Sequence, residues 1–312
     1  MDLEIKMDDS IPSEKRVPLA DPFILCHEGA YYAYGTHSKD GIEVYQSEDL
    51  KHWRGGVGRS KERLALHKDD SFGDCGFWAP EIYYVEGRFL MYYTASKRAC
   101  VAVADNPLGP FIQPVKESLI PDEYSIDSSL FIDDDGKPYL FFARSPNHNG
   151  SEIWSMELEQ DLMHVIPKTF RCHARPWQPW ELKESIINEG PFVLKHNGIY
   201  YLTYSGNAQT CSEYGIGCAV SDHIDGIWRK YDDNPILQNC GGLCCVGHHS
   251  FFNDTDGNLR IVFHARMAPV PTGQRHTYIG TARFDGNGTH PAHLVIDNNF
   301  IIPELIYNDS DT

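Results

Sequence analysis

Short apolar runs separated by polar turns dominate the hydrophobic pattern of this chain. The runs are rich in Tyr, Phe, Val and Ile, and clusters of Gly, Asp, Asn and Pro bound them, whereas helical periodicity is scarce. Aromatic and β-branched side chains favour strands because they pack well on a pleated, half-buried surface. The pattern therefore predicts a chain made mostly of short β-strands.

Five of these runs share one internal order, in which an apolar stretch meets a polar turn with Gly and then a second aromatic-rich stretch. They read DPFILCHEGAYYAYG from position 21, APEIYYVEGRFLMYYT from 79, DSSLFIDDDGKPYLFFA from 127, EGPFVLKHNGIYYLTYS from 189 and HHSFFNDTDGNLRIVFHA from 248. Each is typical of a β-hairpin. A third strand and a turn ending on an aromatic follow most copies, as at Trp53, Phe111 and Trp228. The hairpins recur roughly every 50–60 residues, which is enough for one four-stranded blade.

This repeat predicts an all-β fold, a five-bladed β-propeller in which residues 1–312 form a single domain. One such unit cannot bury both faces, whereas five stacked radially bury a continuous core. We expect an N-terminal arm over about 1–18 and a closing strand over about 291–306 that pairs with the first blade. A β-sandwich or two small β domains would also contain many short strands, but the near-constant spacing argues against both.

Ionisable residues begin four of the five hairpins at matching distances before the turn glycine. They are Asp21, Asp127, Glu189 and His248. Radial repetition carries matching positions to a common ring around the axis, so we expect these side chains to face one another across a narrow funnel. Burial and mutual repulsion would raise the pKa of at least one carboxyl group, which is the arrangement that acid–base chemistry needs.

The second hairpin begins differently, with Phe77 and Trp78 in place of an ionisable residue. A flat aromatic face is suited to stacking on a sugar ring, so both residues are predicted to bind substrate. Each polar residue of the ring also has a structural interpretation, because Asp-Pro and Glu-Gly-Pro are common turn sequences. Their shared place in the repeat favours the functional interpretation.

Charge and composition exclude several classes of partner. Lys and Arg number 27 against 44 Asp and Glu, a net charge of −17, so a phosphate backbone would be repelled and nucleic acid is not expected as a partner. No apolar run approaches the length of a bilayer span, and membrane is not expected either. The polar N-terminus is unlike a signal peptide. This slightly favours a cytoplasmic location, and the alternative is a secreted or periplasmic protein whose signal was trimmed.

Nine cysteines form an odd set without the dense spacing of a disulfide scaffold, which favours reduced thiols. The run from Cys240 through Cys244 and Cys245 to His248 and His249 invites a zinc interpretation. Paired CxxC motifs are absent and adjacent cysteines are awkward ligands, so structural thiols are preferred.

Five short sequence motifs, in this order and spacing, resemble glycoside hydrolase family 43. They are Ala-Asp-Pro at 20–22, Trp-Ala-Pro-Glu at 78–81, Ser-Ile-Asp at 125–127, Asn-Glu-Gly-Pro at 188–191 and Gly-His-His-Ser at 247–250. The resemblance runs from about Asp21 to Arg266. It implies a propeller hydrolase that cleaves α-L-arabinofuranosidic or β-D-xylosidic bonds in oligosaccharides or polysaccharides with inversion.

The resemblance also implies residue roles. Asp21 would be the general base on water, Glu189 the general acid on the leaving oxygen, and Asp127 the residue that orients Glu189 and, by keeping its charge, raises the pKa of that acid. His248 would help to hold a structural Ca²⁺ at the axis, largely through water, and no organic cofactor is implied.

Arg266 follows the fifth hairpin and is predicted to bind a sugar hydroxyl or Asp127. Residues 147–185 depart from the repeat and are rich in Trp and Arg, so they are expected to wall off the pocket and favour cleavage from a chain end. The alternatives left open are a non-catalytic sugar-binding propeller and a related hydrolase or phosphorylase acting on fructosides or mannosides.

Overall fold

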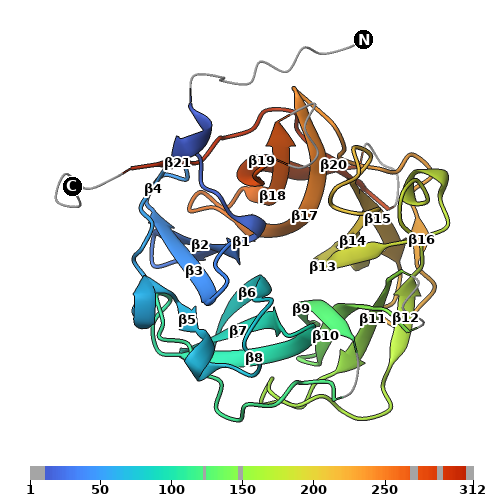
Figure 1. The fold of residues 1–312 in the computed structure, drawn as a ribbon. Helices are drawn as coiled ribbons and strands as arrows, with labels where there is room; N and C mark the ends of the chain where they lie inside the picture. The colour runs from blue at the N-terminus through green and yellow to red at the C-terminus, as the bar shows by residue number, and fades with distance from the viewer. Residues whose placement is uncertain (1–10, 122–123, 147–149, 268–272, 287–290, 307–312) are drawn as a thin grey trace.

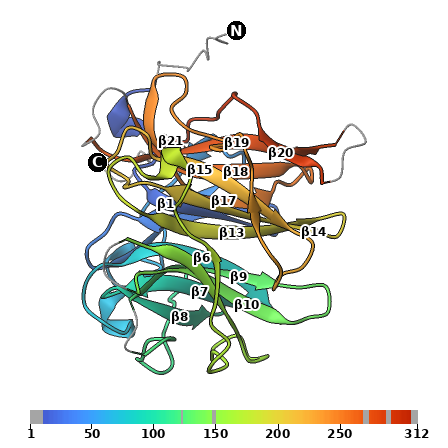
Figure 2. The same ribbon diagram turned by 90° about the vertical axis from the view of Figure 1, so that its right-hand side faces the viewer.

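The structure, a computed structural model, describes residues 11–121, 124–146, 150–267, 273–286 and 291–306. Five small sheets surround one axis, which confirms the predicted five-bladed β-propeller (Figure 1). In the side view, the hairpin of the fourth blade crosses the molecule with neighbouring blades above and below it (Figure 2). Short 3₁₀ turns at Ser13–Lys15, Lys61–Arg63, Lys68–Asp70 and Pro179–Glu181 are the helical elements of the described ranges.

Each blade is an antiparallel meander that starts at the axis. Blade one contains β1 (Ala20–His27), β2 (Ala30–Thr36), β3 (Gly41–Ser47) and β5 (Leu66–His67), and blade two contains β6 (Trp78–Val85), β7 (Arg88–Ala95) and β8 (Arg98–Ala104). Blade three contains β9 (Ser125–Ile132), β10 (Pro138–Arg144), β11 (Glu152–Glu157) and β12 (Arg171–Ala174). Blade four contains β13 (Asn188–His196), β14 (Ile199–Gly206), β15 (Gly215–Ser221) and β16 (Arg229–Lys230), and blade five contains β17 (Leu243–Asn253), β18 (Leu259–Met267), β19 (His276–Asp285) and β20 (His293–Ile296). The five predicted hairpins are thus the two innermost strands of every blade.

Separate apolar clusters fill the spaces between neighbouring blades. Between blades one and two, for example, Phe23 and Tyr34 pack with Phe89 and Met91, and all four are buried. Similar clusters lie between blades two and three, three and four, four and five, and five and one. Each blade buries apolar side chains on both of its faces, which explains why the predicted runs are apolar with little strict alternation.

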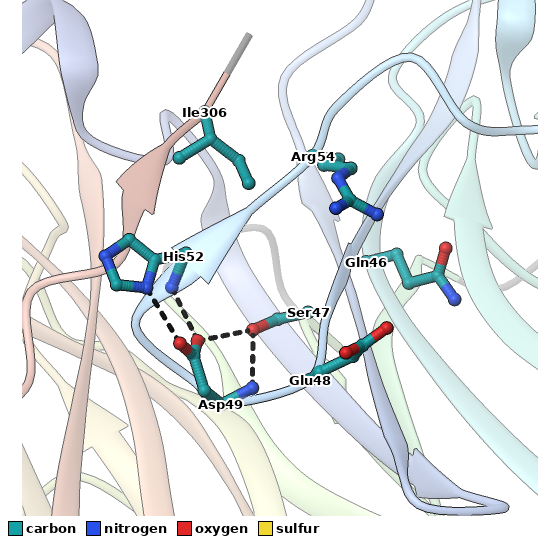
Figure 3. Close-up of a pocket in the computed structure, with 7 residues that line it drawn as sticks. All are labelled: Gln46, Ser47, Glu48, Asp49, His52, Arg54 and Ile306. Carbon is teal, nitrogen blue, oxygen red and sulfur yellow. Dashed lines mark hydrogen bonds and ion pairs between the residues drawn. The ribbon is translucent and has the colours of Figure 1, made fainter. Parts of the chain in front are cut away.

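The ring closes through both ends of the described chain. β21 (Glu304–Leu305) pairs in parallel with β4 (His52–Trp53), and Val17 N donates to Pro303 O at 3.1 Å. The predicted closing run 291–306 therefore divides, because β20 completes blade five and only β21 pairs with a strand next to blade one. A cavity of about 130 Å³ lies beside this closure, where Asp49 accepts bonds from the His52 ring and backbone (Figure 3). None of its residues belongs to the five sequence motifs that resemble the family. It is lined by Gln46, Ser47, Glu48, Asp49, His52, Arg54 and Ile306.

Within the segment 147–185, Gly150 and Ser151 line a cavity of about 260 Å³ together with Glu189, and much of the rest belongs to blade three. β11 and β12 lie within this segment and complete blade three, with Ile153 paired to Ala143 and Ala174. The repeat was obscured because the connection between these strands is long, not because the blade is missing. In the described part of the chain, no helix is long and apolar enough to cross a membrane.

Candidate active site

The innermost strand of every blade carries a bulge near its start. The residue at the bulge has a positive φ in all five blades: 48° at Asp21, 43° at Ala79, 58° at Asp127, 55° at Gly190 and 44° at His248. Non-glycine residues pay for this conformation with roughly 1–3 kcal/mol, and such outliers cluster at functional sites. The bulges break the strand pairing and turn the side chains of Asp21, Asp127 and His248 to the axial site.

Glu189 differs from the other ring residues by one position. The bulge residue of blade four is Gly190, so Glu189 precedes the position that Asp21 and Asp127 occupy. Counting from the turn glycine hid this offset, because the bulges of the blades are not equally far from their turns. The structure nevertheless brings the three carboxyl groups together, since the charge of Asp21 acts on the pKa of both Asp127 and Glu189.

Hydrogen bonds from the bulge amides join four of the five blades to the preceding one. Ala79 N donates to Thr36 Oγ1 (3.0 Å), Asp127 N to Thr94 Oγ1 (3.1 Å), His248 N to Ser205 Oγ (2.8 Å) and Asp21 N to His264 Nδ1 (3.1 Å). These acceptors lie on the second strands, opposite the residue before each bulge. We call the contacts inter-blade amide bonds, and they hold the axial backbone in its strained form.

Asp21 is buried among positively charged or polar partners. Its Oδ1 lies 2.9 Å from Arg275 Nη1 and 3.3 Å from His248 Nδ1, and Thr36 Oγ1 donates to its Oδ2 at 2.6 Å. Burial favours the neutral acid, but Arg275, His248 and His264 outweigh it and hold the pKa of Asp21 well below its ordinary value. Asp21 is therefore ionised at neutral pH.

The pKa values of Glu189 and Asp127 are raised, in contrast to that of Asp21. Burial raises the pKa of Glu189 to about 7, against the hydrogen bond that Tyr214 donates to Glu189 Oε1 at 2.7 Å. Burial, Glu189 and Asp21 raise the pKa of Asp127 well above its ordinary value. Burial thus works against the expected charge on Asp127, and the hydrogen bond from Gly190 N works for it. Two crowded carboxyl groups titrate as a pair, and this pair retains a proton near neutral pH.

The aromatic residues predicted at the site have different surroundings. Trp78 begins β6, is partly exposed and packs its ring on Gly76. Phe77 is 1% exposed and belongs to the apolar cluster between blades one and two. Substrate therefore cannot reach the Phe77 ring, and that predicted binding role is wrong because inter-blade packing takes up the side chain.

The arginine at the site is Arg275, not the predicted Arg266. The Arg266 guanidinium donates to Gln209 O and Gln209 Oε1, both at 2.5 Å, and to Gly273 O at 2.7 Å. Arg275 lies just before β19, outside the hairpin repeat, so no repeat position could have indicated it. Tyr214, Thr36 and His264 were also missed, because their roles arise from contacts between blades.

The cysteines and histidines of the described run 240–249 do not form a metal-ligand cluster. No group of three or more His, Cys, Asp or Glu side chains that could hold a metal ion is present among the described residues. All nine cysteines are free thiols, and His249 is buried with Nε2 2.7 Å from Thr203 Oγ1. His248 offers one imidazole beside the Asp21–Arg275 pair, which does not fit a directly ligated Ca²⁺.

A five-bladed propeller whose bulged inner strands gather two aspartates and a glutamate defines a class of propellers with an acidic axial site. Residues 15–290 match the family described as glycosyl hydrolases family 43. The chain belongs to glycoside hydrolase family 43.

Its relatives include a xylosidase/arabinosidase of Butyrivibrio fibrisolvens, 33% identical over 262 residues that cover 78% of this chain and 47% of the relative. A solved structure titled endo-1,4-beta-xylanase, from Bacteroides thetaiotaomicron, is 38% identical, with a TM-score of 0.86 and coverage of 94% and 98%. A thermostable family-43 glycoside hydrolase of solved structure is 32% identical, with a TM-score of 0.79 and coverage of 92% and 95%. The chain spans about half the length of the Butyrivibrio relative.

Proposed function

We propose that this protein is an inverting glycoside hydrolase that cleaves α-L-arabinofuranosidic or β-D-xylosidic bonds in oligosaccharides or polysaccharides. The observation that carries the proposal is that two carboxyl groups at one axis have pKa values shifted in opposite directions. Asp21 is held ionised by Arg275, while burial keeps Glu189 protonated up to about pH 7. A charged base and a neutral acid are the pair that inversion requires.

In this mechanism Asp21 accepts a proton from a water molecule as the water oxygen bonds to the anomeric carbon. The bond between that carbon and the leaving oxygen breaks, and Glu189 donates its proton to the leaving oxygen. After release of product, Asp21 returns its proton to solvent and Glu189 regains one. Asp127 contacts the backbone next to Glu189, because its Oδ2 accepts a bond from Gly190 N at 3.2 Å.

Trp78 is proposed as the platform for a sugar ring, because its indole is partly exposed at the start of β6. Cleavage from a chain end was expected from residues 147–185, but these form the outer strands of blade three. Gly150 and Ser151 of this segment nevertheless line a cavity with Glu189, and exo action remains a prediction for product analysis on undecorated arabinan and xylan.

The test is a panel of p-nitrophenyl pentosides and hexosides, followed by proton NMR of the first sugar formed. We expect hydrolysis of an arabinofuranoside or xyloside and initial product of inverted configuration. Retained configuration would contradict the base role of Asp21. Sugar binding without hydrolysis on every substrate would favour a non-catalytic propeller.

A further inference from the structure

Blade three lacks the acceptor that forms an inter-blade amide bond in the other four blades. The second-strand residues opposite the bulges are Thr36, Thr94, Ala143, Ser205 and His264. Four of them accept the bulge amide of the following blade, but Ala143 carries no acceptor on its side chain. Gly190 N, the amide that such a residue would bind, donates instead to Asp127 Oδ2 at 3.2 Å.

This substitution of partners places a backbone donor on one of the two coupled carboxyl groups. A hydrogen bond donated to a carboxyl oxygen favours the ionised form. The Gly190 amide therefore favours negative charge on Asp127, and the proton that the pair retains is directed towards Glu189. At blade three, a hydrogen bond from Gly190 N to the Asp127 carboxyl group therefore takes the place of an inter-blade amide bond, next to the general acid.

A second donor acts on the other carboxyl group of the pair. Tyr214 is fully buried and donates to Glu189 Oε1 at 2.7 Å, which favours negative charge on Glu189. Its ring stacks on His264 with centroids 5.8 Å apart. A Cβ atom at Gly247 would lie 2.1 Å from the Tyr214 ring, so only glycine leaves room for this tyrosine.

We propose that Ala143 and Tyr214 are positioning residues that set, in opposite directions, where the proton shared by Asp127 and Glu189 resides. Ala143 leaves the Gly190 amide to Asp127 and so keeps the proton on the general acid. Tyr214 stabilises the carboxylate that forms when Glu189 gives that proton to the leaving oxygen. The catalytic meaning of this balance depends on the proposed function, whereas the balance itself does not.

The other groups that act on the pair are Asp21 on β1, Glu81 on β6 and Arg275 before β19, and burial together with the pair raises the pKa of Tyr124 before β9. Burial raises the pKa of Glu81 to about 8, so Glu81 is neutral at pH 7 and adds no charge there. Substitutions at positions 143 and 214 leave these groups in place. A change in titration in such variants therefore reports the altered hydrogen bond.

The experiment compares Tyr214→Phe and Ala143→Ser with the wild type by ¹³C NMR of labelled Asp and Glu carboxyl groups across pH. Tyr214→Phe should raise the Glu189 midpoint by about one pH unit, since a donor to its carboxylate is lost. Ala143→Ser should lower that midpoint by about one unit, because the new hydroxyl takes the Gly190 amide from Asp127. Ala143→Cys has a similar size and a weak acceptor, so it should leave the midpoint unchanged.

Shifts in the same direction for the two variants, or no shift in either, would overturn the proposal. Ala143→Ser should keep wild-type stability in urea unfolding, because its hydroxyl forms the contact present in the other blades. If that variant fails to fold, Tyr214→Phe decides the matter alone: an unchanged or lowered Glu189 midpoint rejects the proposal. The NMR titration needs no turnover, so opposite shifts in a protein inactive on every glycoside would support this inference and reject the proposed function.

Discussion

Arg275 Nη1 lies 2.9 Å from Asp21 Oδ1 and joins the segment before β19 in blade five to the inner strand of blade one. Both side chains are largely buried, at 20% and 9% exposure, so the attraction is screened less than on an open surface. The pair thus explains why Asp21 remains charged in a site where burial favours the neutral acid.

Replacing Arg275 by Met should raise the pKa of Asp21, because the burial penalty is then less well opposed. A general base must be ionised, so the acidic limb of the kcat/KM profile should move upward by about one pH unit or more. Arg260→Met, which breaks the partly buried pair with Asp254 in blade five, is the control and should leave the limb in place. An unchanged acidic limb in Arg275→Met would show that Arg275 does not set the charge of Asp21.

Leaving-group dependence should separate the two catalytic carboxyl groups. Glu189→Gln should lose most activity on natural oligosaccharides but keep a larger share on dinitrophenyl glycosides, whose leaving oxygen needs little protonation. Asp21→Asn should lose both activities, because water must be activated whichever group leaves. The measurement is kcat/KM on both substrate classes, and the reverse pattern would exchange the acid and base roles.

The neighbouring aromatics Phe77 and Trp78 should differ in what their loss affects. Phe77→Ala should lower the free energy of unfolding by about 3–5 kcal/mol, because it empties part of a packed core. Trp78→Ala should raise KM for the preferred glycoside with a smaller loss of stability, since its ring is partly exposed. Urea unfolding and steady-state kinetics on both variants check this, and an unaltered KM in Trp78→Ala would remove the platform role.

Lys230 and Glu181 form a buried ion pair beside Asn188, the residue before Glu189. Asn188 Nδ2 donates to Glu181 Oε1 at 3.0 Å, and Lys230 Nζ donates to Asn188 Oδ1 at 3.2 Å. Lys230→Met leaves the Glu181 charge unpaired and should cost about 3–5 kcal/mol of unfolding free energy. Adding Glu181→Gln should recover part of that loss, and equal stability of the single and double variants in urea would contradict the pairing.

A hydrated Ca²⁺ held near His248 through water remains a prediction from the family resemblance. Dialysis against EGTA should lower Tm and activity, and added Ca²⁺ should restore both, while His248→Ala should abolish the response. Activity and Tm that are insensitive to the chelator would reject the cation, in agreement with the lack of direct ligands among the described residues.

The sequence alone determined the blade count, the hairpins and the identity of the three carboxyl residues, because all of these follow from a local pattern repeated along the chain. A hairpin is specified by a turn glycine between two apolar runs, and its copies carry the same information. The sequence did not predict that the C-terminal run contains two separate strands, β20 and β21, because strands of two to four residues carry little hydrophobic pattern.

Only the tertiary structure decided the contacts between blades. It paired Asp21 with Arg275 rather than Arg266 and buried Phe77. It also placed Glu189 one position before the bulge residue of its blade. Finally, Gly190 N donates to Asp127, because Ala143 has no side-chain acceptor. These features depend on residues far apart in sequence and on bulges that change the strand register by one residue. Burial and distance, which set the pKa of each carboxyl group, exist only once the ring of blades has closed.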